Sequence, residues 1–154
     1  MRLEPKPSEA FIMTRYPHLG RHENILFTWF LKNIGWDDVL RIDYDIRVGK
    51  GYVPDYIKEE NIRRMAEAIT KLRIDAVIER VDEIWIIEIK EKASLSAVGQ
   101  LITYSSYYTK EFKPMKPVNV GVICDYYNPS IVDICEQYSI AIFKVSPNKV
   151  EKIV

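Results

Sequence analysis

Two neighbouring apolar runs, each carrying charged residues, constrain the fold of this chain most strongly. The runs cover residues 73–79 and 84–90, and the residues Arg-Val-Asp-Glu separate them. Short runs rich in β-branched residues on either side of a tight break are typical of two antiparallel strands. The sequence therefore predicts a β-hairpin. Because alternate side chains of a strand share a face, we expect Glu88 and Lys90 on the same side of it.

Closure of this hairpin brings a second carboxylate to that side. If the turn centres on Val81 and Asp82, then Asp75 lies directly opposite Glu88. Both strands are otherwise apolar, and an unpaired buried charge costs several kcal/mol. A magnesium ion, which binds carboxylates together with water and substrate phosphate, would compensate both charges. Lys90 would then orient or deprotonate a water, or stabilise charge on a phosphate. A purely structural ion pair with Lys90 is the alternative.

Periodicity and capping signals predict the elements around the hairpin. A helix is indicated over residues 20–35 by the stripe of Glu23, Phe27, Phe30 and Ile34 and by Gly35 as its end. Further helices are predicted over 57–71, from Ser94 or Ser96 to 112, and from 128 onward, and further strands over 39–48, 118–124 and 140–145. Residues 1–19 lack a clear period and are predicted to form an irregular arm. This order predicts an α/β fold with a mixed central sheet flanked by helices, in a single domain over 20–154.

Composition narrows the class of protein. A chain of 154 residues has the length of one ordinary domain. Lys and Arg number 22 and so do Asp and Glu, so any nucleic-acid partner has to be held by a local patch rather than by a global positive field. Cys124 and Cys135 are interpreted as core thiols of a reducing compartment. Without a long apolar segment or an apolar signal core, we expect a cytoplasmic protein without a membrane partner.

Several motifs in order resemble the PD-(D/E)xK nuclease superfamily, which includes restriction endonucleases, archaeal Holliday-junction resolvases and RecB-like nucleases. Asp75 is followed, after an apolar run, by Glu88-Ile89-Lys90. Glu23 in the first predicted helix is similar to the glutamate of the resolvases, and Gln100 with Tyr104 resembles the Gln-x-x-x-Tyr of the RecB-like branch. The last predicted strand, helix and strand resemble the end of the same fold. The resemblance covers residues 20–146 and implies a restriction-endonuclease-like fold.

The sequence departs from the superfamily at its name-giving dipeptide. Ile74 precedes the aspartate that has the right spacing, whereas the Pro-Asp pair of this chain is Pro54-Asp55. We interpret Pro54-Asp55 as a turn, because turns are the common use of such a pair.

The resemblance implies a set of roles for individual residues. Asp75 and Glu88, assisted by the backbone carbonyl of Ile89, would bind the metal, and Lys90 would be the catalytic lysine. Glu23 would be an accessory ligand or would position water; favourable placement near a helix N-terminus is its alternative role. Gln100 and Tyr104 share a helix face and would touch metal-bound water or substrate, or form an ordinary interfacial pair.

The implied activity is Mg²⁺-dependent hydrolysis of phosphodiester bonds, with Mn²⁺ expected to substitute. DNA is the expected substrate, RNA stays open, and a homodimer is compatible with the superfamily. The alternatives are an inactive nucleic-acid- or protein-binding member of the same fold and a structural assembly protein.

Two further groups of residues carry weaker signals. Lys110, Lys113 and Lys116 form a small basic loop that would contact substrate phosphates or else lie on a solvated surface. His18 and His22 have the spacing of a zinc pair on a helix. Proline and glycine beside and between them disfavour a continuous helix, so we predict no zinc site there.

Overall fold

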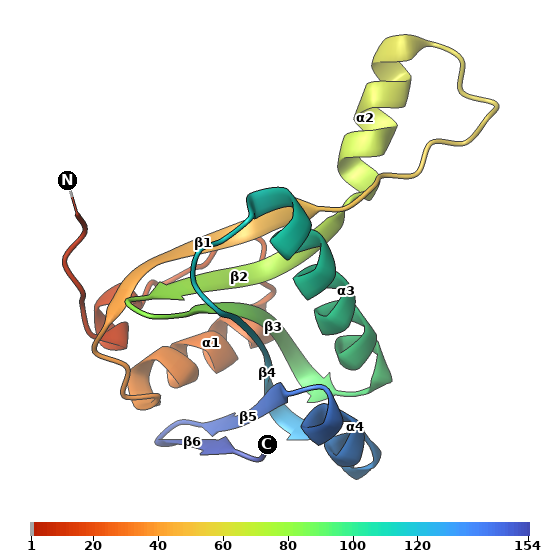
Figure 1. Cartoon of the computed structure of the whole chain (residues 1–154). Helices are drawn as coiled ribbons and strands as arrows, with labels where there is room; N and C mark the ends of the chain where they lie inside the picture. The colour runs from red at the N-terminus through yellow and green to blue at the C-terminus, as the bar shows by residue number, and fades with distance from the viewer. Residues whose placement is uncertain (1) are drawn as a thin grey trace.

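A computed structural model of the chain, describing residues 2–154, shows an α/β protein built on one six-stranded mixed sheet (Figure 1). The strand order in the sheet is the same as the order in the sequence. The strands are β1 (Val39–Val48), β2 (Leu72–Arg80), β3 (Ile84–Ala93), β4 (Val118–Tyr127), β5 (Ile140–Ser146) and β6 (Lys149–Lys152). β1, β2 and β3 form an antiparallel meander, β3, β4 and β5 run parallel, and β6 returns antiparallel to β5.

Helices cover both faces of this sheet. The helices are α1 (Arg21–Asn33), α2 (Glu60–Thr70), α3 (Leu95–Phe112) and α4 (Val132–Gln137), with short 3₁₀ turns η1 (Ser8–Phe11) and η2 (Pro129–Ile131). α1, α3 and α4 cover the sheet, whereas α2 buries no residue. α3 joins β3 to β4 and α4 joins β4 to β5, which is the crossover that parallel neighbours require. One apolar cluster contains the buried residues of α1, and the other contains those of α3 and α4. The result is a sheet between two helical layers.

The predicted α/β class with a mixed sheet and flanking helices is confirmed. Strand 39–48 has the predicted bounds, and the hairpin and the helix that follows Ser94 are present. Gly35, at φ 73°, lies just past the end of α1 in the left-handed conformation that favours glycine. Helix 57–71 begins later than predicted, at Glu60, and strand 118–124 extends to Tyr127. β6 was missed because four residues at a chain end carry too little periodicity.

The N-terminal segment is anchored to the domain along much of its length. Lys6 forms an isolated bridge with Val39, and the Ser8 hydroxyl donates to the Leu31 carbonyl at 2.8 Å. Tyr16 is 2% exposed and packs among the α1-side residues. The segment has little regular structure beyond η1, as its prolines indicated, but it contributes to the core. Residue 1 of the predicted arm lies outside the described residues.

Along β1 and β2, the even-numbered apolar side chains move from one face of the sheet to the other at Asp45 and Asp75, which lie opposite each other. The even-numbered apolar residues of both strands pack with α1 on one side of Asp45 and Asp75 and with α3 on the other, while Val77 alternates normally and faces α3. The α1-side residues are Ile42, Tyr44, Ala76 and Ile78, and the α3-side residues are Ile46, Val48 and Ile74. Asp45 has a φ of 54°, an irregularity that allows this change of face. Two acidic residues therefore lie where the apolar pattern crosses the sheet.

α2 and the loop before it project from the sheet as an arm (Figure 1). α2 has no buried residue, so its position depends on the loop that runs beside it. Tyr52 N donates to the Thr70 hydroxyl at 2.6 Å, and Arg63 donates to the Ile57 carbonyl. A Cβ on Gly51 would overlap the backbone carbonyl of Glu67, so glycine allows the close approach of loop and helix. None of the helices in residues 2–154 has the length and apolar character that a bilayer crossing requires.

Gly51→Ala is therefore expected to loosen the arm without unfolding the domain. Because α2 buries nothing, the melting temperature should change little, whereas amide exchange and protease cleavage over residues 50–71 should increase. Gly99→Ala is the control, since a methyl group there meets open space on α3. That change should stabilise the protein by about 0.5–1 kcal/mol. Unchanged exchange in the arm of Gly51→Ala would contradict the proposed contact.

Candidate active site

Asp75 and Glu88 lie where β2 separates from β3. The ladder between these strands runs from Glu79 opposite Ile84 to Ala76 opposite Ile87, which confirms the register predicted for this part of the hairpin. The next residue on each strand is one of the two acids. The Ile89 backbone N–H donates to Asp75 Oδ2 at 2.9 Å instead of to the backbone of β2. Both carboxylates line one pocket of about 370 Å³.

The Glu88 carboxylate is buried without full compensation. Its residue is 4% exposed and is the one charged residue among the buried ones of the described chain. Oε1 lies 3.4 Å from Lys90 Nζ, whereas Oε2 has no hydrogen-bond partner within residues 2–154. Burial, followed by the negative charge of Asp75, raises the pKa of Glu88 from its ordinary 4.5 to about 8. A cation bound at this position would offset both the cost of burying the Glu88 charge and its repulsion by Asp75.

Burial also raises the pKa of Asp75. The hydrogen bond from Ile89, a hydrogen bond with the Glu88 carboxyl and the charge of Lys90 act in the opposite direction, and the nearby Glu23 adds to the increase. Two adjacent carboxylates whose pKa values are both raised repel each other when ionised. This is the electrostatic arrangement that a divalent cation stabilises.

α3 adds an amide and a phenol to the same pocket. Gln100 and Tyr104 are one turn apart on α3 and both line the pocket with the two acids. Gln100 Oε1 is buried and has no hydrogen-bond partner within the described residues. Tyr104 is 3% exposed, and burial together with the charges of Glu88 and Asp75 raises its pKa. The pocket therefore contains two buried acceptor oxygens without a donor, one on Glu88 and one on Gln100.

Three other predicted site residues lie beside the pocket rather than in its lining. Lys90 is 34% exposed in its side chain and contacts Glu88. Glu23, on the first turn of α1, turns back toward Gly20, where an added Cβ would lie 2.5 Å from Glu23 Oε2. The Ile89 side chain is buried on the α1 side, and its backbone N–H binds Asp75.

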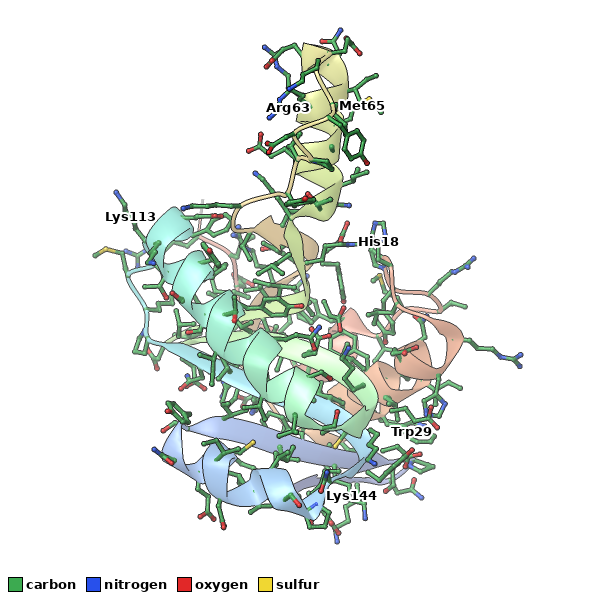
Figure 2. The ribbon with its side chains drawn as sticks, turned by 90° about the vertical axis from the view of Figure 1, so that its right-hand side faces the viewer. His18, Trp29, Arg63, Met65, Lys113 and Lys144 are labelled. Atoms are coloured by element: carbon green, nitrogen blue, oxygen red, sulfur yellow. The ribbon has the colours of Figure 1, made fainter. Side chains whose placement is uncertain are left out.

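The structure does not bring the predicted basic loop to this pocket. Lys116 Nζ donates to the Arg80 carbonyl at 2.9 Å and lies 3.4 Å from Glu79, at the opposite end of β2 from Asp75. Lys113 follows α3 in a left-handed conformation, and Figure 2 shows it at the C-terminal end of that helix. Lys110 Nζ lies 5.7 Å from the centre of the Tyr107 ring. Their role as substrate contacts stays a prediction.

A second wall of the pocket was not predicted from the sequence. Its residues are Pro17, His18, Asp45, Lys71, Leu72 and Arg73. His18 was considered only as a partner of His22, but the structure places its Nε2 3.0 Å from Asp45, whereas His22 lies 4.0 Å from Glu91 and from Asp125. The sequence signal is weak, because Asp45 is one of four charged residues that alternate with apolar ones in β1, and Arg73 is one charged residue near the start of β2.

No preassembled cluster of three or more His, Cys, Asp or Glu ligands exists within residues 2–154. The donor set at the pocket is two carboxylates with an amide oxygen nearby. Such a set suits Mg²⁺, which keeps several waters, better than it suits zinc. Both cysteines are free and buried, in agreement with their predicted place in the core.

Comparison of the chain with family models, curated proteins and solved structures gives no match. The class of protein is therefore defined by the α/β fold and the acidic pocket, and its activity has to be argued from the chemistry of that pocket.

The raised pKa of Glu88 predicts how stability depends on pH without divalent metal. The folded protein holds a proton that the unfolded chain loses near pH 4.5, so stability should fall as pH rises from about 4.5 to about 8. Glu88→Gln should remove much of this slope and stabilise the protein at pH 8, on the order of 2 kcal/mol. Glu91→Gln, an exposed change on the same strand, is the control. Denaturant unfolding in chelator measures the slope, and equal slopes in both variants would contradict the burial argument.

Proposed function

We propose that this chain is a divalent-metal-dependent nuclease of the restriction-endonuclease-like class that hydrolyses phosphodiester bonds in DNA. The observation that carries the proposal is the pair of buried acceptor oxygens, Glu88 Oε2 and Gln100 Oε1, that lack donors beside a second carboxylate. Acceptors without donors favour a cation over a neutral ligand. Mg²⁺ is the proposed ion, with Mn²⁺ as a substitute.

The arrangement of elements supports this class. A helix, three antiparallel strands with α2 inserted between the first two, a helix and a parallel strand follow one another, and the two acids and the lysine lie on β2 and β3. This is the order in which the sequence motifs resemble the PD-(D/E)xK superfamily. Its glutamate on the first helix corresponds to Glu23, whose charge reaches Asp75.

In the proposed reaction, water attacks phosphorus, and the bond to the leaving sugar oxygen breaks to give a phosphomonoester and an alcohol. Asp75, Glu88 and Gln100 would hold the ion, which supplies electrostatic stabilisation of charge on the phosphate. Lys90, 3.4 Å from Glu88, orients the attacking water and stabilises the charge that develops on phosphate oxygens. Glu23 accepts a hydrogen bond from water at the edge of the site. The buried Tyr104 side chain, on α3, holds that side of the pocket in place.

Metal binding should be visible in stability before any substrate is added. Millimolar Mg²⁺ or Mn²⁺ should raise the melting temperature, because a ligand that binds only the folded state stabilises it by mass action. Asp75→Asn should largely abolish this increase and leave the metal-free protein as stable as the parent or more so, since it removes a repelling buried carboxylate. Thermal denaturation with metal or chelator measures both effects. A full metal response in Asp75→Asn would place the ion elsewhere.

Cleavage itself should need the metal and Lys90. Labelled linear, circular and branched DNA, with RNA in parallel, should be cut in Mg²⁺ and not in chelator, and cutting of circular DNA would establish endonuclease activity.

Lys90→Ala should still bind metal and lose about 100-fold or more in rate, about 2.7 kcal/mol of barrier. Lys90→Arg should not restore the rate, because guanidinium cannot copy a compact ammonium. A destabilised but fully active Lys90→Ala would identify a structural ion pair. If no substrate is cut, the alternative of an inactive protein that binds nucleic acid or another protein would replace the nuclease function.

A further inference from the structure

Three chain segments converge on one carboxylate at the second wall of the pocket. Asp45 Oδ1 accepts a hydrogen bond from Arg73 Nε at 2.6 Å, and Asp45 Oδ2 lies 3.0 Å from His18 Nε2. Asp45 belongs to β1, Arg73 to β2 and His18 to the N-terminal segment. All three side chains line the pocket that contains Asp75 and Glu88. The cluster is therefore part of the candidate active site without being among its proposed metal ligands.

The backbone is strained on both sides of this contact. His18 has a φ of 60° and Asp45 a φ of 54°, in the left-handed region that L-residues other than glycine seldom adopt. Asp and His adopt this region more often than most residues do, but it is uncommon even for them and persists where surrounding structure enforces it. The His18 side chain is 56% exposed, so burial of apolar surface does not explain its conformation. The two left-handed residues are the two whose side chains meet, at 3.0 Å between His18 Nε2 and Asp45 Oδ2.

Surrounding contacts hold His18 on both sides. Asn24 Oδ1 accepts a hydrogen bond from Tyr16 N at 2.7 Å, and Asn24 Nδ2 donates to the Leu19 carbonyl at 3.0 Å. The Tyr16 ring is buried, and its hydroxyl lies 2.8 Å from that of Thr28. One side chain of α1 thus fixes the turn before and after His18. This is the preorganisation that a binding site needs.

The charges of this wall are opposite to those of the metal-binding side. Asp45 is 17% exposed and is the one partner that the Arg73 guanidinium contacts among the described residues. That contact uses Nε, the terminal amino groups of Arg73 make no hydrogen bond to another described residue, and its side chain is 43% exposed. Lys71 lines the same wall. Asp45 offsets one of the two permanent positive charges, so the wall stays cationic.

We propose that Arg73, supported by His18 and held in position by Asp45, forms a phosphate-binding subsite for the nucleic-acid strand that enters the pocket. A planar guanidinium presenting two amino groups matches the oxygens of a phosphate, and a fixed carboxylate behind it sets its orientation. The phosphate is one that neighbours the scissile phosphate, since the scissile one has to reach Asp75 and Glu88. This inference rests on the proposed nuclease function. Figure 2 shows His18 near the base of the arm, where Lys71 and Arg73 follow α2.

The test uses binding of a fluorescein-labelled DNA oligonucleotide to the full chain in chelator, followed by fluorescence anisotropy across a salt series. Arg73→Ala should weaken binding about 5- to 30-fold and reduce the slope of log affinity against log salt by about 0.7–0.9, as expected for one lost phosphate contact. Lys149→Ala is the control, because it also removes a cation paired with a carboxylate, at the opposite edge of the sheet. It should change affinity less than 2-fold.

Asp45→Asn tests whether Asp45 acts by orienting the Arg73 guanidinium or only through its own negative charge. Asparagine tolerates positive φ and keeps the size of the side chain, but the change removes one negative charge. General electrostatics would strengthen DNA binding, whereas loss of a positioning residue should weaken it. Methylphosphonate substitution along the oligonucleotide identifies the phosphate, because neutralising it should weaken the parent and have no further effect on Arg73→Ala. Melting temperatures of all variants confirm that each is folded.

The outcomes distinguish this subsite from the proposed function. If the parent cuts DNA in Mg²⁺ while Arg73→Ala and Asp45→Asn bind and cut as the parent does, the subsite is wrong and the nuclease function stands. If the parent binds DNA through Arg73 but never cuts, the subsite stands and catalysis is wrong. A parent that neither binds nor cuts nucleic acid overturns both.

Discussion

The hydrogen bond from the Ile89 backbone N–H to Asp75 is the interaction on which the candidate site depends. The ladder between β2 and β3 ends at Ala76 and Ile87, and the Ile89 N–H beyond it still has an acceptor, the Asp75 carboxylate. β3 remains paired with β4 on its other side, so it stays extended through Glu88 and Lys90. The two strands can therefore separate and open a pocket between acidic side chains without leaving the backbone of Ile89 unpaired. Asp75 Oδ2 accepts the hydrogen bond that a strand carbonyl would otherwise accept, and the same carboxylate faces Glu88.

The buried acids show where folding and the proposed chemistry conflict. Glu88 lies on the sheet face that α3 covers, where an apolar side chain would pack at lower cost, and Lys90 compensates only one of its oxygens. The unpaired Gln100 oxygen adds a second cost at the same place. Natural sequences are locally consistent except at sites with another use. Two of the three buried side-chain polar atoms that lack a partner in residues 2–154 lie in this pocket, the third being His22 Nε2, and this makes the pocket functionally informative.

Local periodicity made the hairpin, its register and the face of Glu88 predictable. Period-two alternation in residues 84–90 and a short turn determine which residues oppose each other, and no distant contact is needed. The second wall could not be predicted in the same way. His18 lies in a segment without periodicity, and Asp45 departs from its strand pattern through a positive φ. Their contact depends on how the irregular segment packs against α1. The place of Lys116 likewise follows from tertiary contacts at the far end of β2.

The change of face in β1 and β2 explains why the polar residues of both walls gather at the middle of these strands. A regular strand would keep its apolar residues on one face and its polar residues on the other along its whole length. Here the even-numbered apolar residues pack with α1 on one side of Asp45 and Asp75 and with α3 on the other, so the residues at the crossover need not belong to either core. Asp45 thereby reaches Arg73 and His18, and Asp75 reaches Ile89. Asp45 and Asp75, one on each wall, thus take their places from the same distortion of the sheet, so a substitution on one wall is expected to affect the other.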